Sequence, residues 1–168
     1  IERYFAEDVP NAKKWVRSLP GGDALDRLRC DLDDAWPGGC SSKKSEEGRA
    51  HHIGLGRVMA GPTQWSRGFV HVDELAPMSP TKGHFSANLY LKLPSEGGHL
   101  ELWPLQFESR WEFYTNAHTL SKLVSIDKEA QRELRARLPP PIVLEVAPGD
   151  LVLLSVQRPH AVQGWSSS

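Results

Sequence analysis

The chain has 168 residues, of which 39% are hydrophobic and 24% charged, and its formal net charge at pH 7 is −1. This length and composition fit one folded domain with a packed core and exclude global disorder. The near-neutral charge offers no basic surface for a nucleic acid or an anionic membrane, and no apolar run approaches the roughly 20 residues that span a bilayer. We expect a cytoplasmic protein without nucleic-acid or membrane partners.

Helices are predicted in the first 50 residues. Apolar residues recur there at spacings of three and four, which is the pattern of one helix face: Ala12, Val16 and Leu19, then Leu25, Leu28, Leu32 and Ala35. Asp23 follows two glycines and suits a helix N-cap, and Pro37 should end the helix because it disfavours the helical conformation in the residue before it. Residues 40–50, which are rich in Ser, Lys, Glu and Gly, indicate a solvated loop.

The two cysteines, Cys30 and Cys40, have the spacing of neither a zinc knuckle nor a CxxC redox pair. We interpret them as reduced thiols of a cytosolic protein, with a disulfide that closes a short loop as the alternative.

Short strands separated by turn residues are predicted from residue 51 onward. The candidates are residues 53–59, 69–73, 85–93, 98–103, 142–147, 151–156 and a final strand that begins at His160. Residues 85–93 alternate apolar and polar side chains, as a half-buried strand does. The segment 104–141 interrupts the strands, and its residues 128–138 resemble a charged surface helix. We therefore predict a single domain, 1–168, in which helical residues 1–50 support an antiparallel sandwich or barrel.

His71-Val72-Asp73 places an imidazole and a carboxylate on one face of a strand, because residues i and i+2 point the same way. A second histidine from a neighbouring strand would complete a set of two histidines and one carboxylate, which leaves three positions on octahedral iron(II) open. His160, which follows Pro159 and begins a strand, is the candidate.

Topology separates this motif from a rival, His99-Leu100-Glu101. In a double-stranded β-helix the ligand-bearing strands are the second and the seventh, which lie side by side with four strands between them. Four predicted strands separate Asp73 from His160, whereas only two separate Glu101 from His160. We predict that His71, Asp73 and His160 are the metal ligands and that His99 and Glu101 belong to an ordinary sheet face.

These motifs resemble the iron(II)/2-oxoglutarate oxygenases. The resemblance rests on Phe69-Val70-His71-Val72-Asp73, Ser86-Ala87-Asn88-Leu89-Tyr90-Leu91, Gly97-Gly98-His99-Leu100-Glu101-Leu102-Trp103, Pro148-Gly149-Asp150-Leu151 and Arg158-Pro159-His160-Ala161-Val162. The second and third strings are similar to the branch that acts on free amino acids, which includes lysine hydroxylases and halogenases and a fungal enzyme that forms an aziridine ring.

The resemblance implies a jelly-roll (cupin-like) fold. It also implies a reaction that consumes O₂ and 2-oxoglutarate and removes a hydrogen atom from an unactivated carbon of a small molecule, such as an amino acid. Halogenases of this branch carry a small residue where this chain has Asp73, so hydroxylation, desaturation or ring closure is expected instead of halogenation. Two alternatives stay open: a cupin-like metal protein that does not use 2-oxoglutarate, and a purely structural β-sandwich.

The basic residue that holds 2-oxoglutarate in this family stands on an eighth strand, and this chain ends at Ser168, eight residues after His160. We expect that strand to lie beyond the sequence. If the chain ends here instead, the barrel is open at one edge and Arg57 or Arg158 could substitute, because an arginine matches a carboxylate bidentately; a surface or structural role is the alternative for each. Asn88 and Tyr90, which share a strand face, are further candidates for contacts to 2-oxoglutarate; a solvated outer face is the alternative. Candidates for substrate contacts are Glu74, which could hold an ammonium group or be exposed to solvent, and Trp103, which could instead belong to the core.

Overall fold

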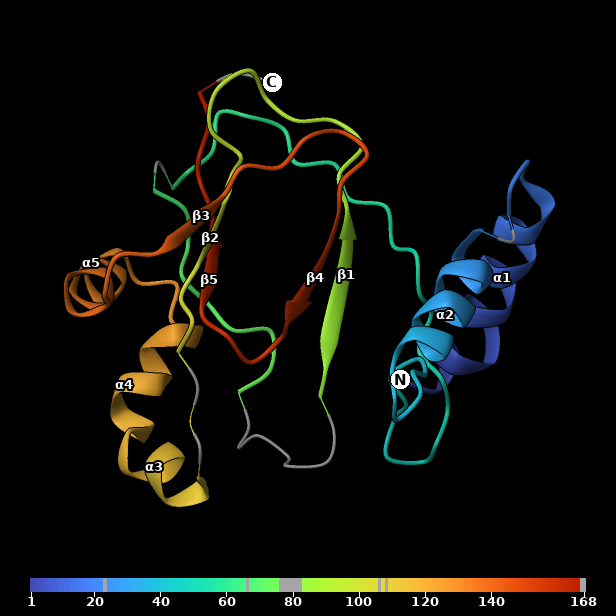
Figure 1. Ribbon diagram of the computed structural model, residues 1–168, viewed down its shortest axis with the longest axis horizontal. Helices are drawn as coiled ribbons and strands as arrows, with labels where there is room; N and C mark the ends of the chain where they lie inside the picture. Colours follow the sequence, from blue (N-terminus) through green and yellow to red (C-terminus); the bar gives the residue numbers. More distant parts are fainter. Residues whose placement is uncertain (23, 66, 76–82, 106, 108, 167–168) are drawn as a thin grey trace. The chain divides into compact units, whose positions relative to one another are not determined.

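A computed structural model describes residues 1–22, 24–65, 67–75, 83–105, 107 and 109–166 of the chain (Figure 1). The chain divides into two compact units, Ile1–Val58 and Met59–Ser168. The first unit ends at Val58 and is therefore longer than the helical N-terminal part that the sequence predicts, residues 1–50. Within the described ranges, none of the helices combines the length and the apolar character that crossing a membrane requires.

The first unit is built from helices, as predicted. A short π-helix, η1 (Tyr4–Asp8), runs into α1 (Val9–Ser18), and α2 (Ala24–Ala35) follows. Helix α2 ends two residues before Pro37, which agrees with the restriction that a proline places on the residue before it. The predicted cap, Asp23, lies outside the described residues.

The prediction of a strand at residues 53–59 is wrong, because this segment has no regular structure. Gly54 has a φ of +86°, which lies outside the β region and interrupts an extended chain. One isolated antiparallel bridge joins Lys44 to Ala50 in the preceding loop. Cys30 and Cys40 are free thiols, as predicted.

Two small antiparallel sheets contain the five strands of the described part of the second unit (Figure 1). Strand β1 (Phe85–Leu89) pairs along its full length with β4 (Leu151–Ser155). Strand β2 (Leu100–Leu102) lies between β3 (Ile142–Leu144) and β5 (His160–Val162). All five strands fall within predicted ones, and most of them are shorter than predicted. The predicted strand at residues 69–73 is reduced to one isolated antiparallel bridge between His71 and His160.

Helices occupy most of the segment between β2 and β3, where only residues 128–138 were expected to be helical. They are α3 (Arg110–Thr115), α4 (Ala117–Ser121), the 3-10 helix η2 (Lys122–Val124) and α5 (Lys128–Arg137). Asp127 caps α5, because its carboxylate accepts a hydrogen bond from the Ala130 amide at 2.7 Å. With these helices, more of the described residues are helical than extended, so the helical share of the chain is larger than predicted.

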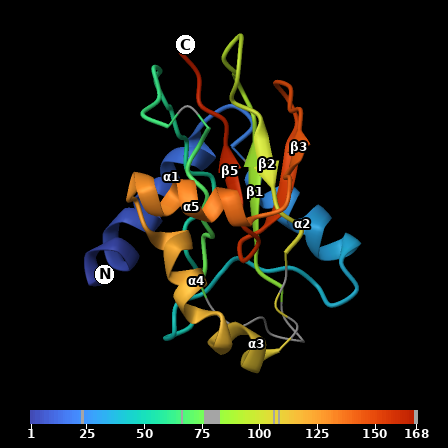
Figure 2. The same cartoon turned by 90° about the vertical axis from the view of Figure 1, so that its left-hand side faces the viewer.

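Helices α4 and α5 cover one face of the sheet that contains β2. Figure 1 shows them on the side away from β1 and β4, and in Figure 2 α5 crosses in front of the strands. The core on this face consists of Val70, Val72, Trp103, Leu120, Leu123, Leu134 and Ala161. Because alternate residues of an extended chain point to opposite faces, burial of Val70 and Val72 turns the side chains of His71 and Asp73 to the other face. Burial of Ala161 does the same for His160.

Candidate metal centre

His71, Asp73 and His160 converge on the face of the sheet opposite α5. The Nε2 atoms of His71 and His160 lie 3.7 and 3.8 Å from Asp73 Oδ1, respectively. One ligand atom from each residue lies within 4.8 Å of the other two. In the described part of the chain, this is the only group of histidine, cysteine and carboxylate side chains close enough to hold a metal ion.

Backbone pairing places the two histidines side by side. The His71 amide donates to the His160 carbonyl and the His160 amide donates to the His71 carbonyl, both at 2.9 Å. Such a reciprocal pair aligns the two residues directly opposite each other on antiparallel strands, and their rings lie 4.3 Å apart between centroids. The Asp73 amide donates to the Val156 carbonyl at 2.9 Å, which fixes the backbone two residues after His71.

Both imidazoles are oriented by a carbonyl two residues earlier in the chain. His71 Nδ1 lies 3.0 Å from the Phe69 carbonyl oxygen, and His160 Nδ1 lies 2.9 Å from that of Arg158. Because a carbonyl oxygen only accepts, each Nδ1 carries the proton, and in the neutral imidazole Nε2 then carries a lone pair. The two Nε2 lone pairs and the Asp73 carboxylate therefore face one another.

This donor set fits a transition-metal ion. Three electron-rich atoms at these distances repel one another, and a cation between them removes that repulsion. Ligand atoms at right angles around an ion with bonds of about 2.0–2.2 Å lie about 3 Å apart, so each observed separation from Asp73 has to shorten by less than about 1 Å. A histidine whose Nδ1–H donates to a carbonyl while Nε2 faces the metal is the usual arrangement of metal-ligating histidines.

Burial differs across the three side chains and affects their chemistry. His160 is 5% exposed, whereas the side chains of His71 and Asp73 are 32% and 42% exposed. Burial lowers the pKa of His160 below its ordinary value of 6.5, because the charged imidazolium loses its hydration; nearby His71 adds to this effect, while the Arg158 carbonyl and Asp73 oppose it. The neutral form that binds metals is therefore favoured at His160, and the open side of the site lies at His71 and Asp73.

Glu74, predicted to contact a substrate, follows Asp73 and is hydrogen-bonded to a histidine. Its Oε2 lies 2.5 Å from His84 Nδ1, and the two side chains are 25% and 44% exposed. The backbones of the same two residues are joined through Val156, whose carbonyl accepts from the Glu74 amide and whose amide donates to the His84 carbonyl. The Glu74 carboxylate lies beside the candidate site but already has a partner.

The residues predicted to hold 2-oxoglutarate differ in how they relate to the triad. Asn88 is exposed on β1, and its amide donates to the Ser86 hydroxyl at 3.3 Å. Tyr90 is half-buried beyond the end of β1, and burial raises the pKa of its phenol. Arg158 contributes its backbone carbonyl to the orientation of His160, and Arg57 is exposed in the first unit.

Trp103 and Glu101, the carboxylate of the rival motif, are buried and have partners within the protein. Trp103 is 1% exposed in the core, and its indole N–H donates to the Pro139 carbonyl at 2.8 Å. Glu101 is 7% exposed and accepts a hydrogen bond from Arg135 at 2.7 Å, so its charge is balanced by a guanidinium. These positions favour structural roles for Trp103 and Glu101.

Three residues that support the site were not among the predicted ones: Phe69, Gln131 and Arg135. Phe69 orients His71 through its carbonyl and also stacks its ring on the imidazole, with centroids 5.3 Å apart and planes at 21°. Gln131 and Arg135 join α5 to the backbone that leads to His71. The spacing of three between Gln131 and the buried Leu134 was the available signal, because it places a polar residue on the apolar face of the helix.

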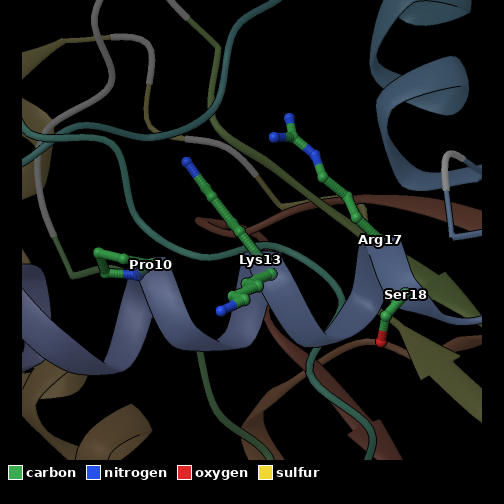
Figure 3. Close-up of a pocket in the computed structure, with 5 residues that line it drawn as sticks. Pro10, Lys13, Arg17 and Ser18 are labelled. Atoms are coloured by element: carbon green, nitrogen blue, oxygen red, sulfur yellow. The ribbon is translucent and has the colours of Figure 1, made fainter.

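A surface hollow on α1 lies in the first unit and includes none of the predicted site residues. It is lined by Pro10, Lys13, Lys14, Arg17 and Ser18, and Figure 3 shows the basic side chains extending from the helix. Arg17 is paired with Asp26 at 3.3 Å. The hollow therefore adds no residue to the candidate metal centre.

Comparisons of the chain with protein-family models, with curated proteins and with solved structures find no significant match.

Proposed function

We propose that this chain is a non-haem iron(II) enzyme that uses 2-oxoglutarate and O₂ to oxidise an unactivated C–H bond of a free amino acid or a similar small metabolite. The observation that carries the proposal is the convergence of two Nε2 lone pairs and one carboxylate, each histidine being oriented by a backbone carbonyl. Two histidines and one carboxylate with open positions are the ligand set of iron(II) oxygenases.

The order of the strands supports the fold that this function implies. Four strands, β1 to β4, separate Asp73 from His160 in the described chain, and His71 pairs directly with His160. The chain passes from β1 to the other sheet for β2 and β3, returns for β4 and crosses again for β5. We propose that the two sheets are the halves of a double-stranded β-helix with the metal between the ligand-bearing strands.

Each residue of the triad would have a distinct part in the reaction. His160 is buried and rigidly paired, so it would anchor the ion, while the more exposed His71 and Asp73 border the side from which small molecules enter. Iron bound here would supply O₂ activation and hydrogen abstraction, which no protein side chain provides. Asp73 fills the position that a halogenase leaves for chloride, so the proposed outcome is hydroxylation, desaturation or ring closure.

Anaerobic titration with iron(II), followed by 2-oxoglutarate and then O₂, tests the proposal. We expect one iron per chain, a change in the visible spectrum when 2-oxoglutarate is added, and succinate formation with at least one amino acid of a panel. His71→Ala and His160→Ala should abolish iron binding, while His118→Ala, at an exposed position on α4, should leave it unchanged.

Two results would redirect the assignment. Tight binding of nickel or zinc at the triad, without a spectral response to 2-oxoglutarate, would support a cupin-like metal protein instead. Equal metal content in the wild type, His71→Ala and His160→Ala would exclude the triad as a metal site and leave a structural β-sandwich.

A further inference from the structure

The chain segment that carries His71 has two edges, and strand β5 pairs with only one of them, through the isolated bridge between His71 and His160. The backbone N–H and C=O of His71 both point to β5, where they bond to His160. In an antiparallel strand, the backbone groups of successive residues point to opposite edges. The N–H and C=O of Val70 therefore point away from β5, at a residue that is completely buried.

A side chain of α5 takes the place of a neighbouring strand at this second edge. Gln131 Oε1 accepts a hydrogen bond from the Val70 amide at 2.8 Å, and Gln131 Nε2 donates to the Val70 carbonyl at 2.9 Å. The same Nε2 also donates to the Ser125 carbonyl at 3.1 Å. Gln131 is 3% exposed, so water cannot readily replace these bonds.

Arg135, one helical turn after Gln131, extends the same contact toward residues 67 and 68 of this segment. Its guanidinium donates to the carbonyls of Arg67 and Gly68. Gly68 has a φ of +74°, and a Cβ there would lie 2.1 Å from the Val162 carbonyl oxygen, so the chain passes too close to β5 for any side chain. Residues 67–70 are thus held between α5 on one side and β5 on the other.

We propose that Gln131 is a positioning residue for the metal centre, a role that rests on the function proposed above. Gln131 fixes the backbone of Val70, and Val70 is bonded directly to His71. Without the amide, a buried N–H and a buried C=O lose their partners, and the strand has to shift or open to satisfy them. Either change moves His71 relative to Asp73 and His160, so metal affinity should fall by about tenfold or more, as when partners outside the ligand set are removed.

A pair of variants separates positioning from stability. Gln131→Met keeps the size of the side chain and removes both bonds to Val70, whereas Leu134→Ala loses buried packing on the same face of α5 and leaves those bonds intact. The probe is Co²⁺, whose visible spectrum reports coordination geometry and whose titration gives the dissociation constant. Hydrogen exchange of the Val70 amide provides a second measurement that does not involve the metal.

For Gln131→Met we expect weaker Co²⁺ binding, an altered visible spectrum and faster hydrogen exchange of the Val70 amide. For Leu134→Ala we expect a lower Tm but the wild-type spectrum and dissociation constant. Identical Co²⁺ binding by the wild type and Gln131→Met, or equal losses in both variants, would overturn the positioning role alone. If Gln131→Met does not fold, Gln131→Glu, which loses the donor to the Val70 carbonyl, takes its place with the same criteria. A wild type that binds no Co²⁺ overturns the proposed function and this role together, while Val70 exchange still reports the contact.

Discussion

Replacement of Arg135 by methionine should destabilise the second unit strongly. The guanidinium lies 2.7 Å from the Glu101 carboxylate, and the two side chains are 11% and 9% exposed. Loss of one partner of a buried ion pair costs about 3–5 kcal/mol, because an uncompensated charge stays behind. Gln163 donates to the other Glu101 oxygen at 3.3 Å and offsets part of this cost, so we expect a value near the lower limit, about 3 kcal/mol.

Urea unfolding of four proteins measures this effect: the wild type, Arg135→Met, Glu101→Gln and the double variant. Glu101→Gln should cost less than Arg135→Met, because Arg135 keeps the carbonyls of Arg67 and Gly68 as acceptors. In the double variant no unpaired carboxylate is buried, so its loss should be smaller than the sum of the single losses by about 1–3 kcal/mol.

Two results would refute this reasoning. Additive losses, or a cost below about 1 kcal/mol for Arg135→Met, would mean that the pair is hydrated and behaves as a surface ion pair. Loss of metal binding in Glu101→Gln, with His71→Ala unaffected, would instead favour the rival His99 and Glu101 site.

Three further predictions concern the site and α5. Burial lowers the pKa of His160 in the folded protein, so the unfolded chain binds more protons. Stability should therefore fall as the pH drops below about 6.5. In thermal melts between pH 7.5 and 5.5, His160→Gln should reduce this dependence. Asp127→Ala should lower the free energy of unfolding by about 1 kcal/mol, because it removes the cap on the Ala130 amide; a control change at the exposed Arg132 should have little effect. Glu74→Gln should lower the free energy of unfolding by less than about 1 kcal/mol, since the bond from Glu74 to His84 is partly exposed. The same variant should leave the affinity for iron(II) unchanged in the anaerobic titration, and loss of iron binding would show that Glu74 itself is a ligand.

Local patterns in the sequence were sufficient for the parts of the fold that neighbouring residues control. The alternation Val70, His71, Val72, Asp73 predicts which side chains enter the core and which face the other way, because the strand period is fixed by backbone geometry. Counting strands predicted that His71 and His160 are neighbours, and the structure shows their paired backbones. The helix at 128–138 was predicted from its charge pattern and the prolines that follow it.

Tertiary structure decided what depends on residues that are distant in the chain. Gln131 and Val70 are 61 positions apart, and Arg135 and Glu101 are 34 apart, so no local period relates them. The segment 53–59 had the composition of a strand, but no strand pairs with it in the described chain, so it lacks the ladder of backbone hydrogen bonds that defines a strand. The sequence could therefore name the three candidate ligands, whereas only the folded chain determined which nitrogen of each histidine faces the centre and which helix holds the segment that bears His71.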